Sequence, residues 1–352
     1  MKVWIDALTP KQALFFNVVK DWLKSGGHEV FSTTRAGYGG YELGSIVNYY
    51  LEVVGKHGLT PFEKLVESSR RIQALSKIIY DGCFDLALSF SSPECARVSF
   101  GLGIPHLNFS DSPHAVHASK LTVPLSRLLF TPWIIPTNVW TKYGIEAKNV
   151  IHYRAIDAYI WLRNWHFRDM KKELGLEKRL TITIRMHEEY ASYLLGKGGN
   201  VLGFVREIVN QYADKANIII LSRYQNGNSN LKTEFGDDIT LLDSAVDGPS
   251  LIKSSDVFVG MGGTMTHEAA LLGVPAISAY PGKATLIEEF LIKKKLIFKH
   301  DNVNAFMKFL SLVCCDDDWR IKYRKRSHEF WDSLEDPREK IISKIETIGK
   351  KV

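Results

Sequence analysis

The chain has 352 residues, of which 45% are hydrophobic and 24% are charged, and its formal net charge is +6 at pH 7. This length and this apolar content allow two globular domains, each with its own core, and exclude disorder as the dominant state. The four cysteines include no CxxC pair, and two of them are adjacent, which argues against a disulfide framework or a zinc site.

Neither a secretory signal nor a membrane-spanning segment is predicted. The stretch MKVWIDALTP lacks the basic start and the apolar core of a signal peptide, and no apolar run approaches the length of a transmembrane helix. We therefore expect a cytoplasmic protein. Basic residues concentrate at 293–295 and 322–326, where such runs most often form solvated helix faces. The alternative is attraction to a nucleotide or to lipid head groups, and the latter would place the protein peripherally on the inner face of the membrane.

Strand-like runs alternate with helical patterns along the chain, an order typical of parallel βαβ units. The first unit is a strand at 2–6 and a helix in which Leu14, Val18 and Trp22 recur at four-residue spacing. The segment SGGHEV ends this helix and starts the next strand. Further strands are predicted at 50–55, 85–90, 104–109 and 127–132, with helices at 61–82 and 92–103.

The alternation restarts after an aromatic, charged segment at 153–178. We predict an α/β protein with two Rossmann-like parallel-sheet domains that face each other across a cleft, where ligands bind beyond the carboxyl ends of the strands. The second half has predicted strands at 180–185, 217–222, 239–242, 256–260 and 275–280 and a helix at 201–214. The predicted boundaries are 1–155 for the N-terminal, acceptor-binding domain, 156–170 for the connection and 171–325 for the C-terminal domain. Residues 326–352 are predicted to form a helical tail that packs on either domain.

The stretch VFVGMGGTMTHEAALLGVPAIS, residues 257–278, reads as a strand, a glycine turn and a helix. Glycines let backbone amides approach a ligand, and the free N–H groups and dipole at a helix start favour a phosphate. The hydroxyls of Thr264 and Thr266 add donors, and Glu268 is one turn into the helix, suited to accept bonds from sugar hydroxyls. The alternative is a plain tight turn with Glu268 solvated. The loop is neither a Walker loop nor the first-turn GxGxxG of dinucleotide-binding proteins.

With these residues the stretch SSDVFVGMGGTMTHEAALLGVPAIS resembles the nucleotide-sugar loop of B-type glycosyltransferase (GT-B) folds. Examples are the lipid-linked N-acetylglucosaminyltransferase of peptidoglycan synthesis and UDP-N-acetylglucosamine 2-epimerase. From KVWIDALTPKQ to GGTMTHEAALLG and YPGK, nearly the whole chain resembles an uncharacterised, largely archaeal family of that superfamily. The resemblance implies a GT-B-like fold.

The resemblance also implies a nucleotide-sugar site in the second domain. The diphosphate would lie on the glycine turn, the ribose against Glu268, and the base against segment 241–246, largely through backbone atoms. The epimerase's basic HRREN segment falls near Arg185. The residues implied to bind the nucleotide sugar are Gly262, Gly263, Thr264, Thr266, Glu268, Arg185, His187, Glu288 and Glu289.

Three polar stretches at predicted strand ends of the first domain supply candidate chemistry: 6–12, 89–95 and 108–115. The densest has Asp111, Ser112 and His114 within four residues, enough for a general base that deprotonates an acceptor hydroxyl. The alternative is a helix cap with exposed histidines. The remaining candidates on this side of the cleft are Asp6, Thr9 and Lys11, the last being either a phosphate or substrate contact or a solvated side chain.

The first domain departs from the epimerase pattern. The epimerase has carboxylates in two of these loops, but its GDTT loop is replaced by SFSSPE, in which only a displaced Glu94 offers one. Asp111 roughly occupies the place of the epimerase's VEAG glutamate, so we take Asp111, His114 and Glu94 as the candidate catalytic residues. The departure argues against epimerisation. We expect no metal and no cofactor, because His114 and His117 lack a third ligand and the DDD run at 316–318 predicts a helix boundary.

These observations predict a glycosyltransferase that uses a nucleotide sugar, with UDP as the favoured nucleotide, and an acceptor bound by the first domain. A UDP-sugar 2-epimerase or hydrolase, and a non-catalytic nucleotide-sugar-binding protein, remain as alternatives. The acceptor is left open between a lipid-linked molecule and a small glycan, and a homodimer is also left open. Nucleic acid is not an expected partner, because no nucleic-acid-binding motif accompanies the basic runs.

Overall fold

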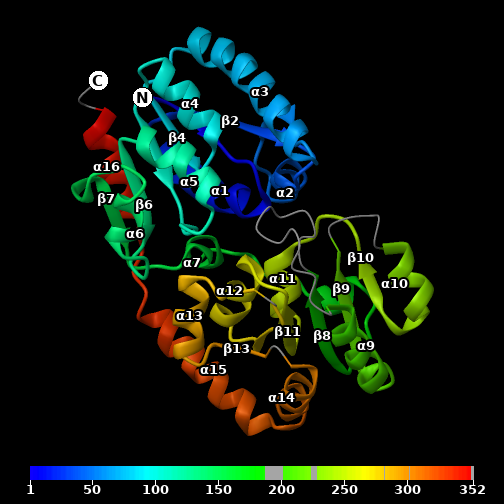
Figure 1. The fold of residues 1–352 in the computed structure, drawn as a ribbon. Helices are drawn as coiled ribbons and strands as arrows, with labels where there is room; N and C mark the ends of the chain where they lie inside the picture. Colours follow the sequence, from blue (N-terminus) through cyan, green and yellow to red (C-terminus); the bar gives the residue numbers. More distant parts are fainter. Residues whose placement is uncertain (187–200, 223–227, 281, 301, 350–352) are drawn as a thin grey trace. The chain divides into compact units, whose positions relative to one another are not determined.

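The computed structural model describes residues 1–186, 201–222, 228–280, 282–300 and 302–349. The chain divides into two units, Met1–Trp161 with Glu335–Val352 (unit 1) and Leu162–Leu334 (unit 2). Each unit contains one parallel sheet with helices packed on it (Figure 1). The predicted α/β class with two Rossmann-like parallel-sheet units is therefore confirmed.

The sheet of unit 1 has seven strands in the order β3-β2-β1-β4-β5-β6-β7. Its strands are β1 Lys2–Asp6, β2 Glu29–Ala36, β3 Glu52–Lys56, β4 Leu86–Phe90, β5 His106–Phe109, β6 Leu128–Pro132 and β7 Val150–Tyr153. Its helices are α1 Pro10–Ser25, α2 Gly40–Ile46, α3 Pro61–Gly82, α4 Pro93–Gly101, α5 Val116–Thr122, α6 Thr137–Thr141 and α16 Arg338–Gly349, while α7 Asp157–Leu162 lies where the chain passes from unit 1 to unit 2.

The sheet of unit 2 has six strands in the order β10-β9-β8-β11-β12-β13. Its strands are β8 Leu180–Arg185, β9 Ala216–Leu221, β10 Thr240–Leu242, β11 Val257–Gly260, β12 Ala276–Ser278 and β13 Ile297–Lys299. Its helices are α8 Met170–Glu173, α9 Val201–Tyr212, α10 Asn228–Phe235, α11 Gly248–Lys253, α12 Thr264–Leu271, α13 Leu286–Lys293, α14 Val303–Cys315 and α15 Asp317–Asp332.

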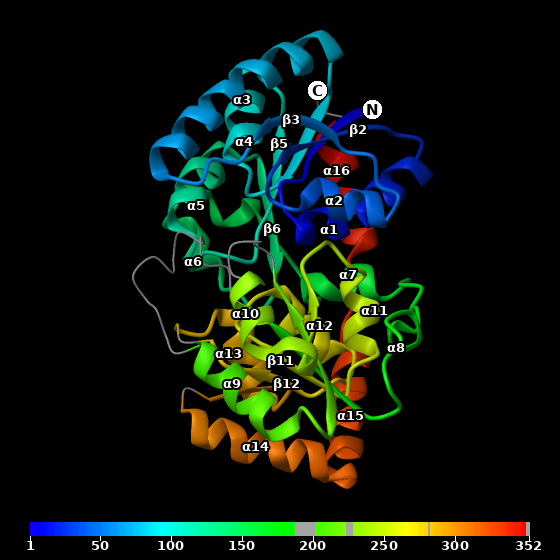
Figure 2. The same ribbon diagram turned by 90° about the vertical axis from the view of Figure 1, so that its right-hand side faces the viewer.

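Helix α1 shows how the sequence fixes the core of unit 1. Thr9 accepts a hydrogen bond from the backbone N–H of Gln12 and so caps the helix, and Pro10 occupies its first turn. The adjacent Phe15 and Phe16 then pack edge-on against aromatic rings from the ends of β4 and β5. Helices α1 and α16 lie together on one side of the sheet, and α3 and α4 lie together on the other (Figure 2).

The central strands of unit 2 are buried on both faces, as parallel sheets covered by helices require. All six residues of β9 are buried. Its alternate residues Ile218 and Ile220 pack in the cluster that contains α9 and α14, whereas Ile219 and Leu221 pack in the cluster that contains α8 and α11. This two-residue alternation makes the strand a continuous apolar run in the sequence.

Two strands escaped the sequence analysis, β7 in unit 1 and β13 in unit 2. Both are edge strands, of four and three residues. An edge strand is hydrogen-bonded on one side only, and so few residues give no clear periodicity. The DDD run was predicted correctly as a helix boundary, since Asp316 caps α15 by accepting a bond from the N–H of Trp319.

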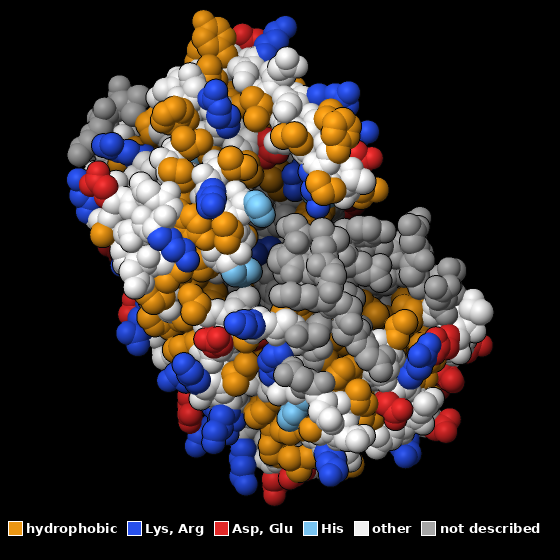
Figure 3. Space-filling model, in the orientation of Figure 1, with side chains coloured by type: hydrophobic (Ala, Val, Ile, Leu, Met, Phe, Trp, Pro, Cys, Tyr) orange, Lys and Arg blue, Asp and Glu red, His pale blue; other side chains and the backbone are white. Residues whose placement is uncertain are grey.

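The basic runs lie on the surface of unit 2. Lys293, Lys294 and Lys295 are exposed at the end of α13, and most side chains of the 322–326 run are exposed on α15. Lys and Arg side chains are interspersed with Asp and Glu over the face of unit 2 seen in Figure 3. No helix within the described ranges has the length and apolar character needed to cross a membrane.

Candidate functional site

Strand order locates one candidate site edge in each unit. The order reverses between β1 and β4 in unit 1 and between β8 and β11 in unit 2. In open parallel sheets, ligands bind beyond the carboxyl ends of the strands at such a reversal. The register pairs Asp6 with Ser89 at the end of the first pair and Arg185 with Gly260 at the end of the second. These two edges carry the polar stretches singled out from the sequence.

The glycine turn of unit 2 connects the end of β11 to the start of α12. Gly262 and Gly263 have φ angles of 89° and 91°. Residues with a side chain rarely adopt such positive values, so the turn needs both glycines. Gly263 is also the N-cap residue of α12, and as a glycine it makes no side-chain cap hydrogen bond to the first turn. A helix start without a capping side chain is suited to an anion.

Close packing holds the start of α12 against β11. A Cβ at Gly260 would lie 2.0 Å from the hydroxyl oxygen of Thr266, so only glycine allows this approach. Within the described part of the chain, that buried hydroxyl has no hydrogen-bond partner. Glu268 is 2% exposed. This burial excludes the alternative in which Glu268 is a solvated helix residue.

Arg185 lies beside the glycine turn. Its carbonyl accepts a bond of 3.2 Å from the N–H of Met261, and its guanidinium donates to the carbonyl of Leu221 at 3.3 Å. The neighbouring strand β12 leads to Glu288, whose carboxylate accepts a bond of 2.7 Å from Ser278. Glu288 is buried and Glu289 is exposed. His187 lies outside the described residues.

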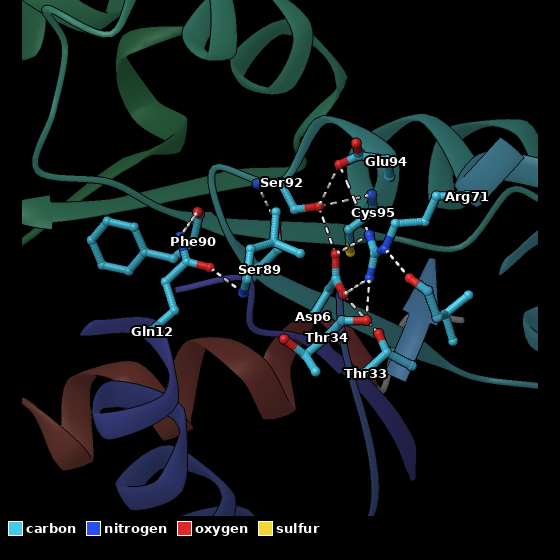
Figure 4. A network of polar contacts seen from close by, with 12 residues as sticks. Asp6, Gln12, Thr33, Thr34, Arg71, Ser89, Phe90, Ser92, Glu94 and Cys95 are labelled. Carbon is cyan, nitrogen blue, oxygen red and sulfur yellow. Dashed lines mark hydrogen bonds and ion pairs between the residues drawn. The ribbon is translucent and has the colours of Figure 1, made fainter. Parts of the chain in front are cut away.

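Asp6 at the end of β1 belongs to a buried network (Figure 4). Its carboxylate accepts two bonds from Arg71, at 2.6 and 3.0 Å, and further bonds from Ser92 and Thr33 at 2.6 and 2.7 Å. Burial acts to raise the pKa of Asp6, but the charge of Arg71 and these bonds together lower it below its usual value. Asp6 is fully buried and its four bonds are internal. The structure therefore gives it a scaffold position, not a solvent-facing one.

Glu94 turns into the same network. It is 3% exposed, accepts a bond of 3.4 Å from Ser92 and lies 3.9 Å from a guanidinium nitrogen of Arg71. Sequence analysis missed Arg71, which reaches Asp6 from α3. The signal was available, because Arg71, Leu75 and Ile79 form the buried stripe of that helix at four-residue spacing. A charged residue in such a stripe needs a buried partner.

A second polar cluster in unit 1 centres on Lys11, in the first turn of α1. Its ammonium lies 2.5 Å from a carboxylate oxygen of Asp111 and 2.7 Å from one of Asp157. Ser112 donates to the other oxygen of Asp111 at 2.8 Å. Burial acts to lower the pKa of Lys11, but the two carboxylates raise it above its usual value, so Lys11 stays charged. The alternative of a solvated Lys11 does not hold, since its side chain is 15% exposed.

The inner part of this cluster was not anticipated from the sequence. Asp157 is 2% exposed, and its carboxylate accepts a hydrogen bond from Tyr153. Burial raises the pKa of Asp157 to about 6, against the lowering effect of Lys11 and with the help of Asp111. The available signal was Asp157, four residues after a tyrosine in the aromatic, charged segment at 153–178, which the sequence analysis treated only as a break between the two domains.

His114 lies near the outer part of the cluster and is exposed. Partial desolvation lowers the pKa of its imidazole, Asp111 acts to raise it, and Lys11 lowers it further. The imidazole is therefore neutral at pH 7 and can accept a proton. The structure thus brings together Lys11, Asp111 and Ser112, and it places His114 close enough for the charges of Asp111 and Lys11 to shift its pKa. Asp6 and Glu94 belong instead to the Arg71 network.

A family model described as "Protein of unknown function (DUF354)" matches residues 1–342 of this chain. The chain belongs to this DUF354 family. The uncharacterised protein MJ0665 of Methanocaldococcus jannaschii is 27% identical to it over 324 residues, which are 88% of this chain and 91% of the relative.

Solved structures share the fold of this DUF354 protein. The UDP-GlcNAc 2-epimerase from Neisseria meningitidis, bound to UDP-GlcNAc, matches with a TM-score of 0.73 and 16% identity, covering 99% of this chain and 100% of that one. The spinosyn forosaminyltransferase SpnP matches with a TM-score of 0.65 and 15% identity, covering 99% of both chains. These similarities confirm the predicted GT-B-like fold.

Proposed function

We propose that this DUF354 protein is a glycosyltransferase that binds a nucleotide sugar, with UDP as the favoured nucleotide, at the carboxyl ends of β8 and β11. The observation that carries the proposal is the glycine turn at the strand-order reversal. Its positive φ angles, its uncapped helix start and the adjacent Arg185 together suit a diphosphate. Structures of the same fold include a UDP-GlcNAc 2-epimerase bound to UDP-GlcNAc and a forosaminyltransferase.

In this mechanism the diphosphate is the leaving group. The acceptor oxygen attacks the anomeric carbon, and the bond from that carbon to the diphosphate breaks. Negative charge then grows on the diphosphate, where Arg185 and the N–H groups at the start of α12 stabilise it. The buried Glu268 would receive the ribose hydroxyls, and Glu288 those of the sugar.

Asp111 would be the base that removes the proton of the acceptor hydroxyl. It is the more exposed of the two carboxylates on Lys11, at 12% against 2% for Asp157. Asp6 and Glu94 are both turned toward Arg71. One reactive carboxylate suffices for glycosyl transfer, which favours transfer over an epimerisation that draws on carboxylates from two loops.

Binding and catalysis are tested separately. Thermal-shift titrations with UDP, GDP, UDP-N-acetylglucosamine and NAD should show stabilisation by one uridine nucleotide, about 2.7 kcal/mol at a hundredfold excess over Kd. Glu268→Ala should lose this stabilisation, whereas Glu329→Ala, an exposed carboxylate on α15, should keep it. The donor site would be refuted if millimolar nucleotide left the wild-type melting temperature unchanged.

Turnover then distinguishes the reactions. Release of UDP with transfer of the sugar to an added acceptor supports a transferase, release to water a hydrolase, and a changed sugar configuration an epimerase. Asp111→Asn should retain nucleotide binding and lose release of UDP by about two orders of magnitude or more, the usual contribution of a general base. Full activity of this variant would exclude Asp111 as the base.

A further inference from the structure

We propose that Asp157 is a positioning residue that shares the ammonium of Lys11 with Asp111 and thereby makes Asp111 a stronger base than it would be as the only carboxylate on that ammonium. The inference deepens the proposed function and rests on it for its catalytic meaning. Its structural basis is a row of groups from three parts of unit 1, with Asp111 at the outer end, Lys11 in the middle, and Asp157 and Tyr153 at the inner end.

The geometry of the row leaves Lys11 little freedom. Its ammonium contacts Asp111 at 2.5 Å and Asp157 at 2.7 Å, and it lies 4.3 Å from the centre of the Phe90 ring. The aromatic face stabilises the cation from a third direction. Tyr153, at the end of β7, donates its hydroxyl proton to Asp157 and fixes the inner carboxylate. The inner carboxylate is the most deeply buried of the three charged groups.

The charges explain why two carboxylates are needed. A carboxylate paired alone with a buried lysine is held in its ionised form and is a weak base. A second carboxylate on the same ammonium divides the attraction and adds like-charge repulsion, so that the pair binds a proton more readily. The groups that act on Asp157 and on one another here are Lys11 from α1, Asp111, Ser112 and His114 from the segment after β5, and Tyr153 from β7.

Proton transfer to Asp111 keeps the buried charge balanced. The O–H bond of the acceptor breaks and a new O–H bond forms on Asp111. The acceptor oxygen uses the freed electron pair to bond to the anomeric carbon, and the bond from that carbon to the diphosphate breaks with its electron pair going to the diphosphate. Lys11 then loses its outer ionised partner but retains Asp157. A buried ammonium without any carboxylate would be costly, so the inner carboxylate makes the protonated state of Asp111 accessible.

The experiment is a titration of the full chain labelled with 13C at the aspartate carboxyl carbons, followed by NMR. In the wild type, Asp157 should titrate near pH 6. In Asp157→Asn, the midpoint of the Asp111 signal should move to lower pH by about one unit, a tenfold loss of proton affinity. Asp157→Glu should restore it. An Asp111 midpoint that stays unchanged in Asp157→Asn would overturn the proposal, because a merely structural role predicts no shift.

A second variant keeps the test decisive if Asp157→Asn does not fold. Tyr153→Phe removes only the hydrogen bond to Asp157. It should raise the titration midpoint of Asp157 and lower that of Asp111, because a more readily protonated Asp157 leaves more of the attraction of Lys11 to Asp111. Movement of neither midpoint would contradict the shared-ammonium arrangement. Binding of UDP, measured in parallel by thermal shift, should be unaffected by either variant. Failure of the wild type to bind UDP would therefore refute the proposed function, whereas unchanged titration midpoints of Asp111 and Asp157 in the variants would refute this inference.

Discussion

Single residues in unit 1 carry charges that the fold must compensate, and Arg71 is the clearest case. It is 1% exposed, donates two bonds to Asp6 and further bonds to the carbonyls of Val54 and Thr34. Removing one partner of a buried ion pair leaves an uncompensated charge. We expect Arg71→Met to lower the free energy of unfolding by about 3–5 kcal/mol.

Chemical denaturation of Arg71→Met and of the double variant Asp6→Asn/Arg71→Met checks this expectation. The double variant removes both charges and should recover part of the loss. Lys77→Met, on the same helix, is the matched surface control, since Lys77 is exposed. Equal destabilisation by the single and double variants would show that packing, and not the unpaired carboxylate, dominates.

Asp157 gives a pH-dependent prediction. Its pKa in the folded state, about 6, lies above the usual 3.8. The folded state therefore binds this proton more tightly than the unfolded state, and the stability from this group is lost as pH rises from about 4 to about 6. Replacement by Asn removes this pH-dependent loss. The unfolding free energy of Asp157→Asn minus that of the wild type should therefore increase by about 2–3 kcal/mol as the pH rises from about 4 to about 7. Unfolding free energies at these pH values test this, and a difference independent of pH would contradict it.

At the scale of elements, the contact between β11 and α12 depends on Gly260. Alanine there would place its methyl 2.0 Å from the Thr266 hydroxyl and 3.2 Å from the Thr266 Cβ, so α12 must move. We expect Gly260→Ala to destabilise by about 1–3 kcal/mol, as overpacking does, and to weaken nucleotide binding. Gly260→Ala/Thr266→Ala removes the nearer atom and should recover most of the stability. Melting temperatures of the set, with Thr266→Ala alone as control, decide whether the clash is the cause.

The same element shows what the sequence can predict. A strand, a glycine turn and a helix follow one another within residues 257–271, so local pattern identified them. The network at Asp6 joins residues 65 positions apart, and the ion pair of Lys11 and Asp111 joins residues 100 apart. Such pairs depend on which strand ends and helix faces meet. Sequence analysis placed the segments of Lys11 and Asp111 at predicted strand ends of the first domain, but it did not predict that Arg71 or Asp157 would supply partners.

At the scale of the whole molecule, both sheets repeat one strand order over six strands, and unit 1 adds β7 at its edge. Unit 1 is completed by the end of the sequence, because Glu335–Val352 returns to it and α16 packs beside α1. The sequence analysis left the partner of this tail open. An amphipathic helix shows which of its faces is buried, but not the surface that covers it.

This return of the chain predicts which unit depends on α16. Ile341 and Ile345 are 0% exposed, and truncation of a buried isoleucine to alanine costs about 2–5 kcal/mol. We expect Ile341→Ala/Ile345→Ala to reduce hydrogen-exchange protection in β1 and α1 of unit 1 and to leave protection in β8 and β11 of unit 2 unchanged, because only unit 1 loses core contacts. Ile342→Ala, at a partly exposed position on the same helix, is the control and should change neither. Equal loss of protection in both units would show that they unfold as one cooperative structure.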